Sequence, residues 1–166
     1  IKPDAVLTLC AGCGSTIRNN WPTVLGRSLP FKHMDISEFL AKQIDLNVRD
    51  MPPVNLAVTY HDPCHLKRGL GVSEEPRQLI NKVPGIRFVE MEEPDSCCGA
   101  GGGLRSGKLS TSLKIARKKA EMIKETQVNT VVTICPFCQL QIRDAIDQLA
   151  LKGIDVMNIT EMLNIR

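Results

Sequence analysis

TVVTICPFC, residues 130–138, is the part of this chain from which the fold is most readily inferred. Residues 130–134 predict a short strand, which ends where Cys135 begins a C-x-x-C pair. Pro136 suits the first position of a helix, where its missing N–H costs no hydrogen bond. Apolar residues at helical spacing follow, namely Ile142, Ala145, Ile146 and Leu149. The stretch therefore predicts a strand that leads directly into a helix.

The same alternation of strand and helix extends along the rest of the chain. Further strands are expected at residues 5–9, 54–60, 86–91 and 156–159. Further helices are expected after Cys13, at residues 36–44, at residues 77–82 and at the C-terminus. Strands that alternate with helices indicate an α/β fold, so we expect a Rossmann-like, mostly parallel sheet flanked by helices.

The clearest helix pattern lies in the segment before the strand at residues 130–134. Apolar residues step by four, three, four and three positions, in the order Leu109, Leu113, Ala116, Ala120 and Ile123. This spacing predicts one buried helix face. The opposite face is charged and is interpreted as solvated, with Lys114, Arg117, Lys118, Glu121 and Lys124 on it.

An internal repeat divides the chain. Residues 7–13, LTLCAGC, align with residues 132–138, VTICPFC, at an offset of 125. Residues 33–40 align with residues 156–163 at an offset of 123, so the register is nearly constant. The repeat predicts that residues 1–52 are the C-terminal remnant of a first module and that residues 53–166 are a complete module. A linker is expected at residues 50–53, and the rest of the first module is expected upstream of Ile1.

Cysteine is the residue type that carries the chemistry. Five of the seven cysteines form one ordered set, in which 32 residues separate the first from an adjacent pair and 36 separate that pair from a C-x-x-C. They are Cys64, Cys97, Cys98, Cys135 and Cys138. Cys10 and Cys13 form a second C-x-x-C. Soft thiolates in such numbers select iron–sulfur clusters or zinc, and inert burial explains only one or two of them.

The number and grouping of the cysteines indicate a reducing compartment. Seven is odd, so a full disulfide framework would leave one cysteine over, and C-x-x-C and C-C are groupings of ligands. We therefore expect a cytoplasmic protein.

Each group of cysteines follows an expected strand. In open α/β sheets, binding sites lie outside the carboxyl ends of the strands, so three neighbouring loops are expected to bring the cysteines together. A C-x-x-C that opens a helix also places its sulfurs near free N–H groups, which favour the thiolate. Gly99 and Gly101 follow the adjacent pair and are expected to let the backbone turn and approach an anionic group.

Three histidines are present, and two of them flank the first cysteine of the set. His61 and His65 are candidates for metal ligands, for hydrogen-bond donors around a metal, or for ordinary helix-capping residues. His65 is also a candidate proton donor to a substrate. His33 is assigned a structural role, and Asp62 is assigned as a helix cap.

Composition excludes two classes of partner. The net charge of +3 and six aromatic residues argue against nucleic-acid binding, which favours a clustered basic face and stacking platforms. No apolar stretch approaches the roughly 20 residues that a membrane span needs.

The spacing of the five cysteines, together with YHDPCHL at residues 60–66, closely resembles the CCG domain, the cysteine-rich domain of heterodisulfide reductases. The same domain occurs in iron–sulfur subunits of glycolate, lactate and glycerol-3-phosphate oxidising complexes, in thiol:fumarate reductase and in some succinate:acceptor reductases. Family members usually carry two such domains in tandem. This arrangement is consistent with the remnant of a first copy.

The resemblance implies a cofactor and a reaction. The ligands of a noncubane 4Fe–4S cluster would be Cys64, Cys97, Cys98, Cys135 and Cys138. The reaction would be reductive cleavage of a disulfide such as CoM-S-S-CoB, in which two electrons and two protons convert S–S into two thiols. Cys10 and Cys13 would belong to an incomplete second site, so we expect an oxidoreductase subunit that is inactive without partners.

The resemblance also implies partners. We expect a ferredoxin-like iron–sulfur subunit or domain and a flavoprotein or cytochrome subunit, through which the protein would associate with a membrane. Basic residues near the cysteines are candidate contacts for anionic groups of the disulfide, namely Lys67, Arg68, Arg105 and Lys108.

Two other functions remain open at this point. The chain would act as an electron-relay iron–sulfur subunit of a flavin-dependent oxidoreductase for 2-hydroxyacids, glycerol-3-phosphate or succinate/fumarate if it bound no substrate. It would be a structural domain if zinc occupied four of the cysteines, alone or with a histidine.

Overall fold

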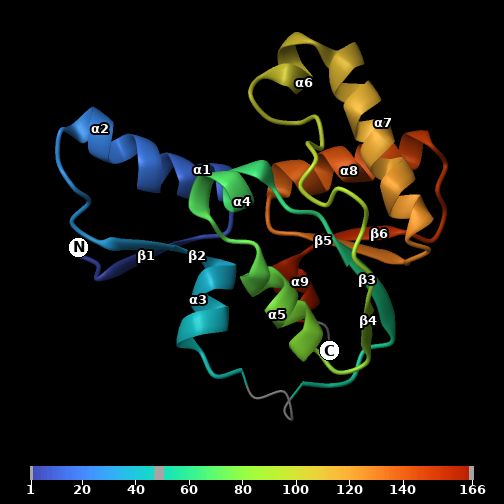
Figure 1. The fold of residues 1–166 in the computed structure, drawn as a ribbon, viewed down its shortest axis with the longest axis horizontal. Coiled ribbons are helices and arrows are strands. Elements are labelled where there is room, and N and C mark those ends of the chain that lie inside the picture. Colours follow the sequence, from blue (N-terminus) through green and yellow to red (C-terminus); the bar gives the residue numbers. More distant parts are fainter. Residues whose placement is uncertain (1, 47–50, 165–166) are drawn as a thin grey trace.

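The structure, a computed structural model, describes residues 2–46 and 51–164 and confirms the α/β fold. Its larger sheet is parallel, with strand order β4-β3-β5-β6 (Figure 1). These strands are β3 (Leu56–Tyr60), β4 (Ile86–Phe88), β5 (Thr130–Thr133) and β6 (Asp155–Asn158). β5 lies between β3 and β6 and is buried along its whole length.

Helices of the larger unit lie on both sides of this sheet and beside it. The helices of this unit are α4 (Cys64–Leu70), α5 (Glu74–Lys82), α6 (Leu104–Gly107), α7 (Leu109–Glu125), α8 (Pro136–Gln148) and α9 (Ile159–Met162). In Figure 1, α7 and α8 lie above the sheet, and α5 and α9 lie below it. The core between these layers consists of fully buried apolar side chains, among them Val58, Tyr60, Leu79, Ile80, Ile123, Val131, Val132 and Ile142. A helix layer on each face explains why β5 carries no polar alternation.

A smaller unit precedes this sheet. Its two parallel strands are β1 (Ala5–Thr8) and β2 (Lys32–Asp35). Its helical segments are α1 (Ala11–Ser15), a π-helical turn η1 (Thr16–Asn20), α2 (Trp21–Leu25) and α3 (Ile36–Gln43). α1 packs so closely on α4 that a Cβ at Gly69 would come within 2.5 Å of Ser15 Oγ. Asn19 Nδ2 donates to Gly69 O at 2.8 Å, so the small unit is fixed to the beginning of the larger one.

The two units repeat one arrangement. Thr8 pairs with Asp35 between β1 and β2 as Thr133 pairs with Asn158 between β5 and β6. In both copies the second strand leads into a helix that its last residue caps. Asp35 accepts from Ser37 N at 2.9 Å, and Asn158 accepts from Thr160 N at 3.1 Å. Residues that the sequence repeat aligned therefore occupy matching positions, while the domain boundary itself stays a prediction.

Several element boundaries differ from the expectation. No strand was predicted at β2, where His33, Met34 and Asp35 are buried beside β1. α5 begins at Glu74, earlier than predicted, and α1 begins before Cys13 because Cys10 occupies its N-cap position. Of the expected linker, Asp50 lies outside the described residues, and residues 51–53 form neither helix nor strand.

The predicted buried face of α7 is wrong at its first position. Leu109 is exposed because α7 projects beyond the sheet at this end, whereas Ala116, Ala120 and Ile123 are buried. Among the described residues, no helix has the length and apolar character that crossing a membrane requires.

Candidate metal centre

All five cysteines of the ordered set line one cavity of about 190 Å³. Cys64 begins α4 directly beyond β3, and the adjacent pair Cys97 and Cys98 lies in the loop after β4. Cys135 occupies the N-cap position of α8 beyond β5, and Cys138 lies in its first turn. Loops at the carboxyl ends of three neighbouring strands thus converge, as the strand order predicts.

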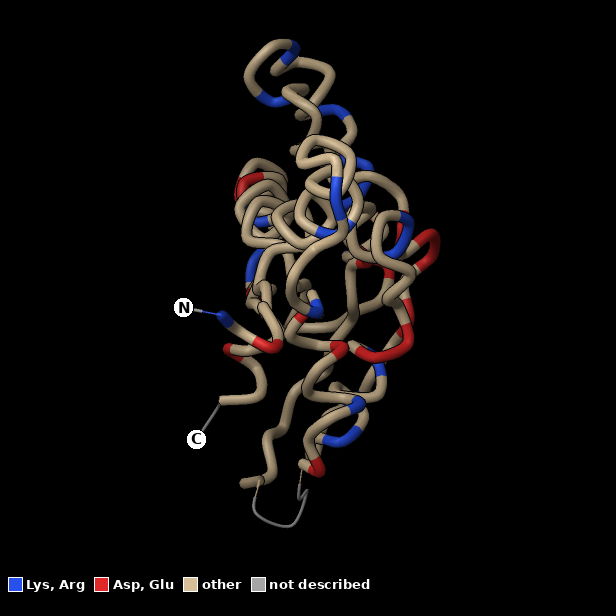
Figure 2. Tube along the Cα trace, turned by 90° about the vertical axis from the view of Figure 1, so that its left-hand side faces the viewer, with Lys and Arg blue, Asp and Glu red and all other residues tan. Residues whose placement is uncertain are grey.

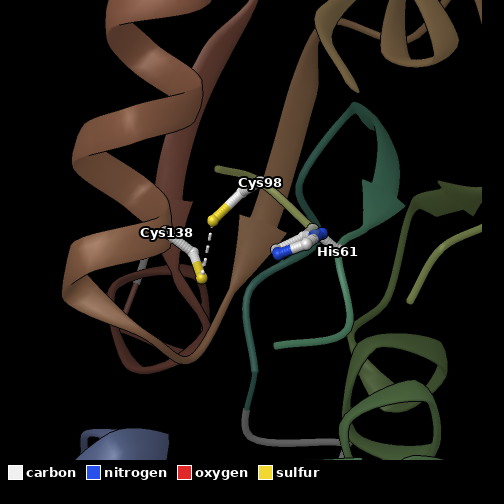
Figure 3. Close-up of side chains that lie close together, drawn as sticks. All are labelled: His61, Cys98 and Cys138. Carbon is white, nitrogen blue, oxygen red and sulfur yellow. Dashed lines mark hydrogen bonds between the residues drawn. The ribbon is translucent and has the colours of Figure 1, made fainter. Parts of the chain in front are cut away.

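The sulfurs at the base of this cavity lie close together. Cys98 Sγ and Cys138 Sγ are 3.3 Å apart, within hydrogen-bonding distance. Donor atoms of His61, Cys98 and Cys138 all lie within 4.8 Å of one another (Figure 3). Cys98, Cys135 and Cys138 are buried, whereas Cys64 is partly exposed and Cys97 is exposed. The cavity therefore has a closed end of buried sulfurs and an open end that solvent reaches.

Hydrogen bonds divide the thiols into two kinds. The hydrogen bond with Cys138 and the N–H groups of Cys138 and Phe137 lower the pKa of Cys135 to about 6. Hydrogen bonds with Cys138 and Cys97 hold the pKa of Cys98 well below its ordinary value. The pKa values of Cys97 and Cys138 are raised by the same hydrogen bonds and by burial. Without a metal the site already favours thiolates at two positions, and thiolates are the form that binds metal.

The loop that carries Cys97 and Cys98 packs against α7 and is hydrogen-bonded to it. Gly99 has φ +87°, and a Cβ there would lie 2.5 Å from Ser112 O of α7. Ser112 Oγ donates to Gly99 O at 2.8 Å, and Gln141 Nε2 of α8 donates to Ser112 Oγ at 2.9 Å. Gly99 N in turn donates to Cys97 Sγ at 3.2 Å. Glycine is required here because the backbone both turns and touches a helix.

The open end of the cavity is lined by groups from both units of the fold. His65 is exposed, and its Nδ1 lies 3.9 Å from Cys64 Sγ. Cβ atoms built at Gly12 and Gly101 would each be 3.9 Å from the His65 ring. Cys10 also lines the cavity, and burial raises its pKa. Cys13 is exposed and is not among the residues that line this cavity, so the structure brings together six of the sulfurs.

The position of His61 favours two of its three predicted roles, whereas the predicted role of Asp62 is wrong. His61 is buried beside the sulfurs rather than at a helix end. Asp62 caps no helix, because Pro63 occupies the N-cap position of α4 and makes no side-chain cap. Instead, the fully buried Asp62 carboxylate accepts from Arg77 at 2.7 and 3.1 Å. Arg77 also pairs with Glu90 and lies 5.3 Å from the centre of the Tyr60 ring, so it connects α5 to the strand ends.

The four predicted anion contacts have different surroundings. Lys67 Nζ and Arg68 Nη2 lie 3.4 and 3.7 Å from Asp95 Oδ2. Arg105 pairs with Asp144 and donates to Gln141. Lys108 is exposed and forms no ion pair within residues 2–46 and 51–164. Lys and Arg recur along the upper part of Figure 2, which α6 and α7 form in Figure 1.

Sequence reasoning missed three buried polar residues around the site. Ser112 and Gln141 hold the cysteine loop, and the nearly fully buried Lys119 donates to Glu93 O at 2.8 Å. Burial lowers the pKa of Lys119 to about 8. Ser112 lies four residues before Ala116 and Lys119 three residues after it, so both lie on the same helix face as Ala116. A prediction of the buried face that also counted polar residues would have included both.

The chain belongs to the CCG family of cysteine-rich domains, whose pattern matches residues 58–143, just over half of the chain. The matched segment includes all five cysteines that line the cavity. This confirms the resemblance inferred from the cysteine spacing.

Relatives from several complexes are similar to most of the chain. One subunit of the fumarate reductase (CoM/CoB) of Methanothermobacter marburgensis is 50% identical over 161 residues, which are 97% of this chain and 32% of that protein. One subunit of the dihydromethanophenazine:CoB–CoM heterodisulfide reductase of Methanosarcina barkeri is 38% identical over 95% of this chain and 39% of that protein. A probable glycolate oxidase iron–sulfur subunit of Bacillus subtilis is 36% identical over 90% of this chain and 36% of that protein. The chain thus spans about a third of the length of these curated relatives.

Proposed function

We propose that this chain is the cluster-binding part of an iron–sulfur redox subunit that interconverts a disulfide and two thiols. The observation that carries the proposal is the convergence of five cysteine sulfurs on one cavity. Relatives named as subunits of a CoM/CoB fumarate reductase and of a CoB–CoM heterodisulfide reductase support it. The half-reaction RS–SR′ + 2e⁻ + 2H⁺ = RSH + R′SH is reversible, so the partner determines its direction.

The residues around the cavity suit a 4Fe–4S cluster. The volume of about 190 Å³ exceeds the about 150 Å³ of an engineered cavity that admits benzene, a ring of six carbon atoms. Cys64, Cys97, Cys98, Cys135 and Cys138 would hold the cluster, which supplies electrons one at a time when bound. An ordinary cubane needs four cysteines, so a fifth favours the noncubane type. None of these three relatives is described as a zinc protein, so they give no support to a zinc site.

The open end of the cavity suits a substrate sulfur. His65 is exposed beside Cys64 and would supply a proton to a departing thiolate. Phe137 is 45% exposed and lines the same cavity, where it would shield the sulfur from water. Anionic substrate groups would have to displace Asp95 to reach Lys67 or Arg68, and Asp144 to reach Arg105. Lys108 is available without such competition.

The proposal includes the two-module organisation. Residues 1–52 would be the C-terminal part of a first module, with Cys10 and Cys13 as part of a second cluster site. The shared register of β1–β2 and β5–β6 supports this assignment. Two one-electron sites would match the two thiols formed. Partners would be a ferredoxin-like iron–sulfur domain and a flavoprotein or cytochrome, since the relatives are named as subunits. The complex would lie in the cytoplasm.

A second candidate function is electron relay without a disulfide substrate. The similarity to a probable glycolate oxidase iron–sulfur subunit favours it. Under this alternative the same cysteines would hold a cluster, but His65 would have no proton to deliver.

Disulfide turnover distinguishes the two functions. The intact complex of the full-length protein with its partner subunits, purified anaerobically, would be supplied with a reduced dye and the CoM–CoB heterodisulfide, and free thiols would be counted. We expect two thiols per disulfide and a several-fold slower reaction in His65→Gln with the cluster intact. A cluster that is oxidised and reduced normally while no disulfide is cleaved or formed would contradict the first function and support electron relay.

A further inference from the structure

His61 is a buried histidine that lies beside the cysteine cavity. It follows β3 directly and is 1% exposed. Neither Nδ1 nor Nε2 has a partner within the parts of the chain that the structure describes. A neutral imidazole still carries one N–H, so the fold has removed a donor from water without giving it an acceptor. Such a group requires an explanation, because buried polar groups are normally paired.

The other buried histidine shows that this fold can satisfy an imidazole. His33 Nε2 lies 3.0 Å from Thr8 Oγ1, and Arg18 Nε donates to His33 Nδ1 at 3.3 Å. Both nitrogens of His33 are therefore occupied in the small unit. Of the two buried histidines, the one beside the cysteines is therefore the one without such partners among the described residues.

Two cysteine sulfurs lie near the His61 ring. Its donor atom lies within 4.8 Å of Cys98 Sγ and Cys138 Sγ, and Figure 3 shows one ring nitrogen facing both. The main chain is held at this point, because His61 N donates to Val132 O at 2.9 Å and Asp62 N donates to Pro94 O at 3.0 Å. A thiolate sulfur accepts hydrogen bonds, so these two cysteines offer an acceptor to the imidazole.

We propose that His61 is a positioning residue that donates an N–H···S hydrogen bond to the thiolate pair Cys98/Cys138 and thereby raises the reduction potential of the cluster they hold. This inference rests on the proposed function. Reduction adds negative charge to the cluster and its sulfurs, so a fixed donor stabilises the reduced state more than the oxidised state. His61 thus favours acceptance of electrons at the buried end of the cavity, away from the open end where His65 lies.

The test uses the full-length protein, purified anaerobically with its clusters. His61→Leu removes the donor and keeps an apolar side chain, while His61→Gln keeps an amide N–H. His33→Gln is the matched control, because it alters a buried histidine in the other unit. Each protein would be measured for iron and sulfide content and for the midpoint potential of the cluster signal in an EPR-monitored redox titration.

We expect His61→Leu to retain its iron and to show a midpoint potential more negative than that of the unaltered protein. His61→Gln should lie closer to the unaltered protein, and His33→Gln should match it. An unchanged potential in His61→Leu would overturn the inference while leaving the proposed function intact. Loss of cluster iron from both folded His61 variants would also overturn it, since His61 would then be a ligand. Absence of any iron–sulfur signal from the unaltered protein would overturn the proposed function as well.

A second measurement does not depend on the folding of His61→Leu. Protein labelled with ¹⁵N-histidine would be studied by pulsed EPR in the reduced state. A weak ¹⁵N coupling that disappears in His61→Gln and persists in His65→Gln is expected. A coupling of the strength found for a metal-bound imidazole, or none that depends on His61, would contradict the hydrogen bond.

Discussion

Cys135 and Cys138 are buried beside β5, whereas Cys10 is partly exposed and Cys13 exposed beside β1. Both pairs nevertheless connect a parallel strand to a helix, and both strand pairs have the same register. The difference lies in the neighbours. β5 has β3 on one side and β6 on the other, whereas β1 pairs with β2 alone among the described residues.

The two units share a local strand–helix arrangement, but the larger unit surrounds it with additional cysteines. A strand, a C-x-x-C and a helix place two sulfurs at a positive helix end in either unit. Only the larger unit adds the loops after β3 and β4, which contribute Cys64, Cys97 and Cys98. The C-x-x-C repeat therefore marks a repeated strand–helix arrangement, and the gathering of five cysteines at one cavity requires the adjacent strands too.

The largest expected difference between the units is in cluster binding. Cys138→Ser removes a buried sulfur of the complete set and should abolish the EPR signal of the cluster at this cavity. Cys13→Ser alters the matching position of the other unit, whose sulfur does not line this cavity, and should leave that signal in place. Equal loss of this signal in both variants would show that the two pairs share one cluster.

Ion pairs of the two units should differ in their effect on stability. Arg77→Met leaves the buried Asp62 without its partner and should lower the free energy of unfolding by about 3–5 kcal/mol. Glu38→Gln breaks a more exposed pair with Arg18 in the small unit and should cost about 1 kcal/mol or less. Urea denaturation of both variants measures the two losses in the free energy of unfolding. Similar losses would mean that the Asp62 pair does not anchor the strand ends.

Glycines with positive φ offer a finer comparison. Gly99→Ala combines a left-handed conformation with a Cβ 2.5 Å from Ser112 O, so it should cost about 2–5 kcal/mol and lower the iron content. Gly26→Ala, at φ +62° with nothing within 4 Å of the new Cβ, should cost about 1–2 kcal/mol and keep the iron. Thermal unfolding and iron analysis measure both. Full iron retention in Gly99→Ala would show that the loop tolerates a shift away from α7.

The smallest expected difference is in thiol ionisation of metal-free protein. The pKa of Cys135 is lowered to about 6, so its thiolate should appear as the pH rises through about 6. Burial raises the pKa of Cys10, so its thiolate should appear only above the ordinary pH range of a thiol. Ultraviolet thiolate absorbance, compared with that of Cys135→Ser and Cys10→Ser, separates the two steps. A Cys135 step at the ordinary thiol pKa would contradict the effect of the Cys138 hydrogen bond and of the N–H groups at α8.

Strand periodicity and cysteine spacing predicted much of the fold and the convergence of the five sulfurs, because both depend on local patterns. β2 was missed since KHMD shows no apolar alternation. Its alignment with residues 156–159, which were expected to form a strand, was nevertheless present in the repeat. Extending each expected element to its repeated partner would have found it.

The partners of His61 and Asp62 could not be predicted. Their positions depend on which helix packs behind β3, and Arg77 reaches Asp62 from α5. A sequence shows that a histidine and an aspartate precede Cys64, but it does not show which of them faces the sulfurs. The Ser112–Gln141 contact likewise joins α7 to α8 across the core.

Locating the iron atoms tests the proposed cluster site most directly. Crystals of the anaerobic full-length protein would be measured at the iron absorption edge, and the anomalous signal would be mapped onto the cavity. We expect about four irons in this cavity, bonded to Cys64, Cys97, Cys98, Cys135 and Cys138. A single metal of another kind, or a cluster held without Cys64 and Cys97, would contradict the proposal.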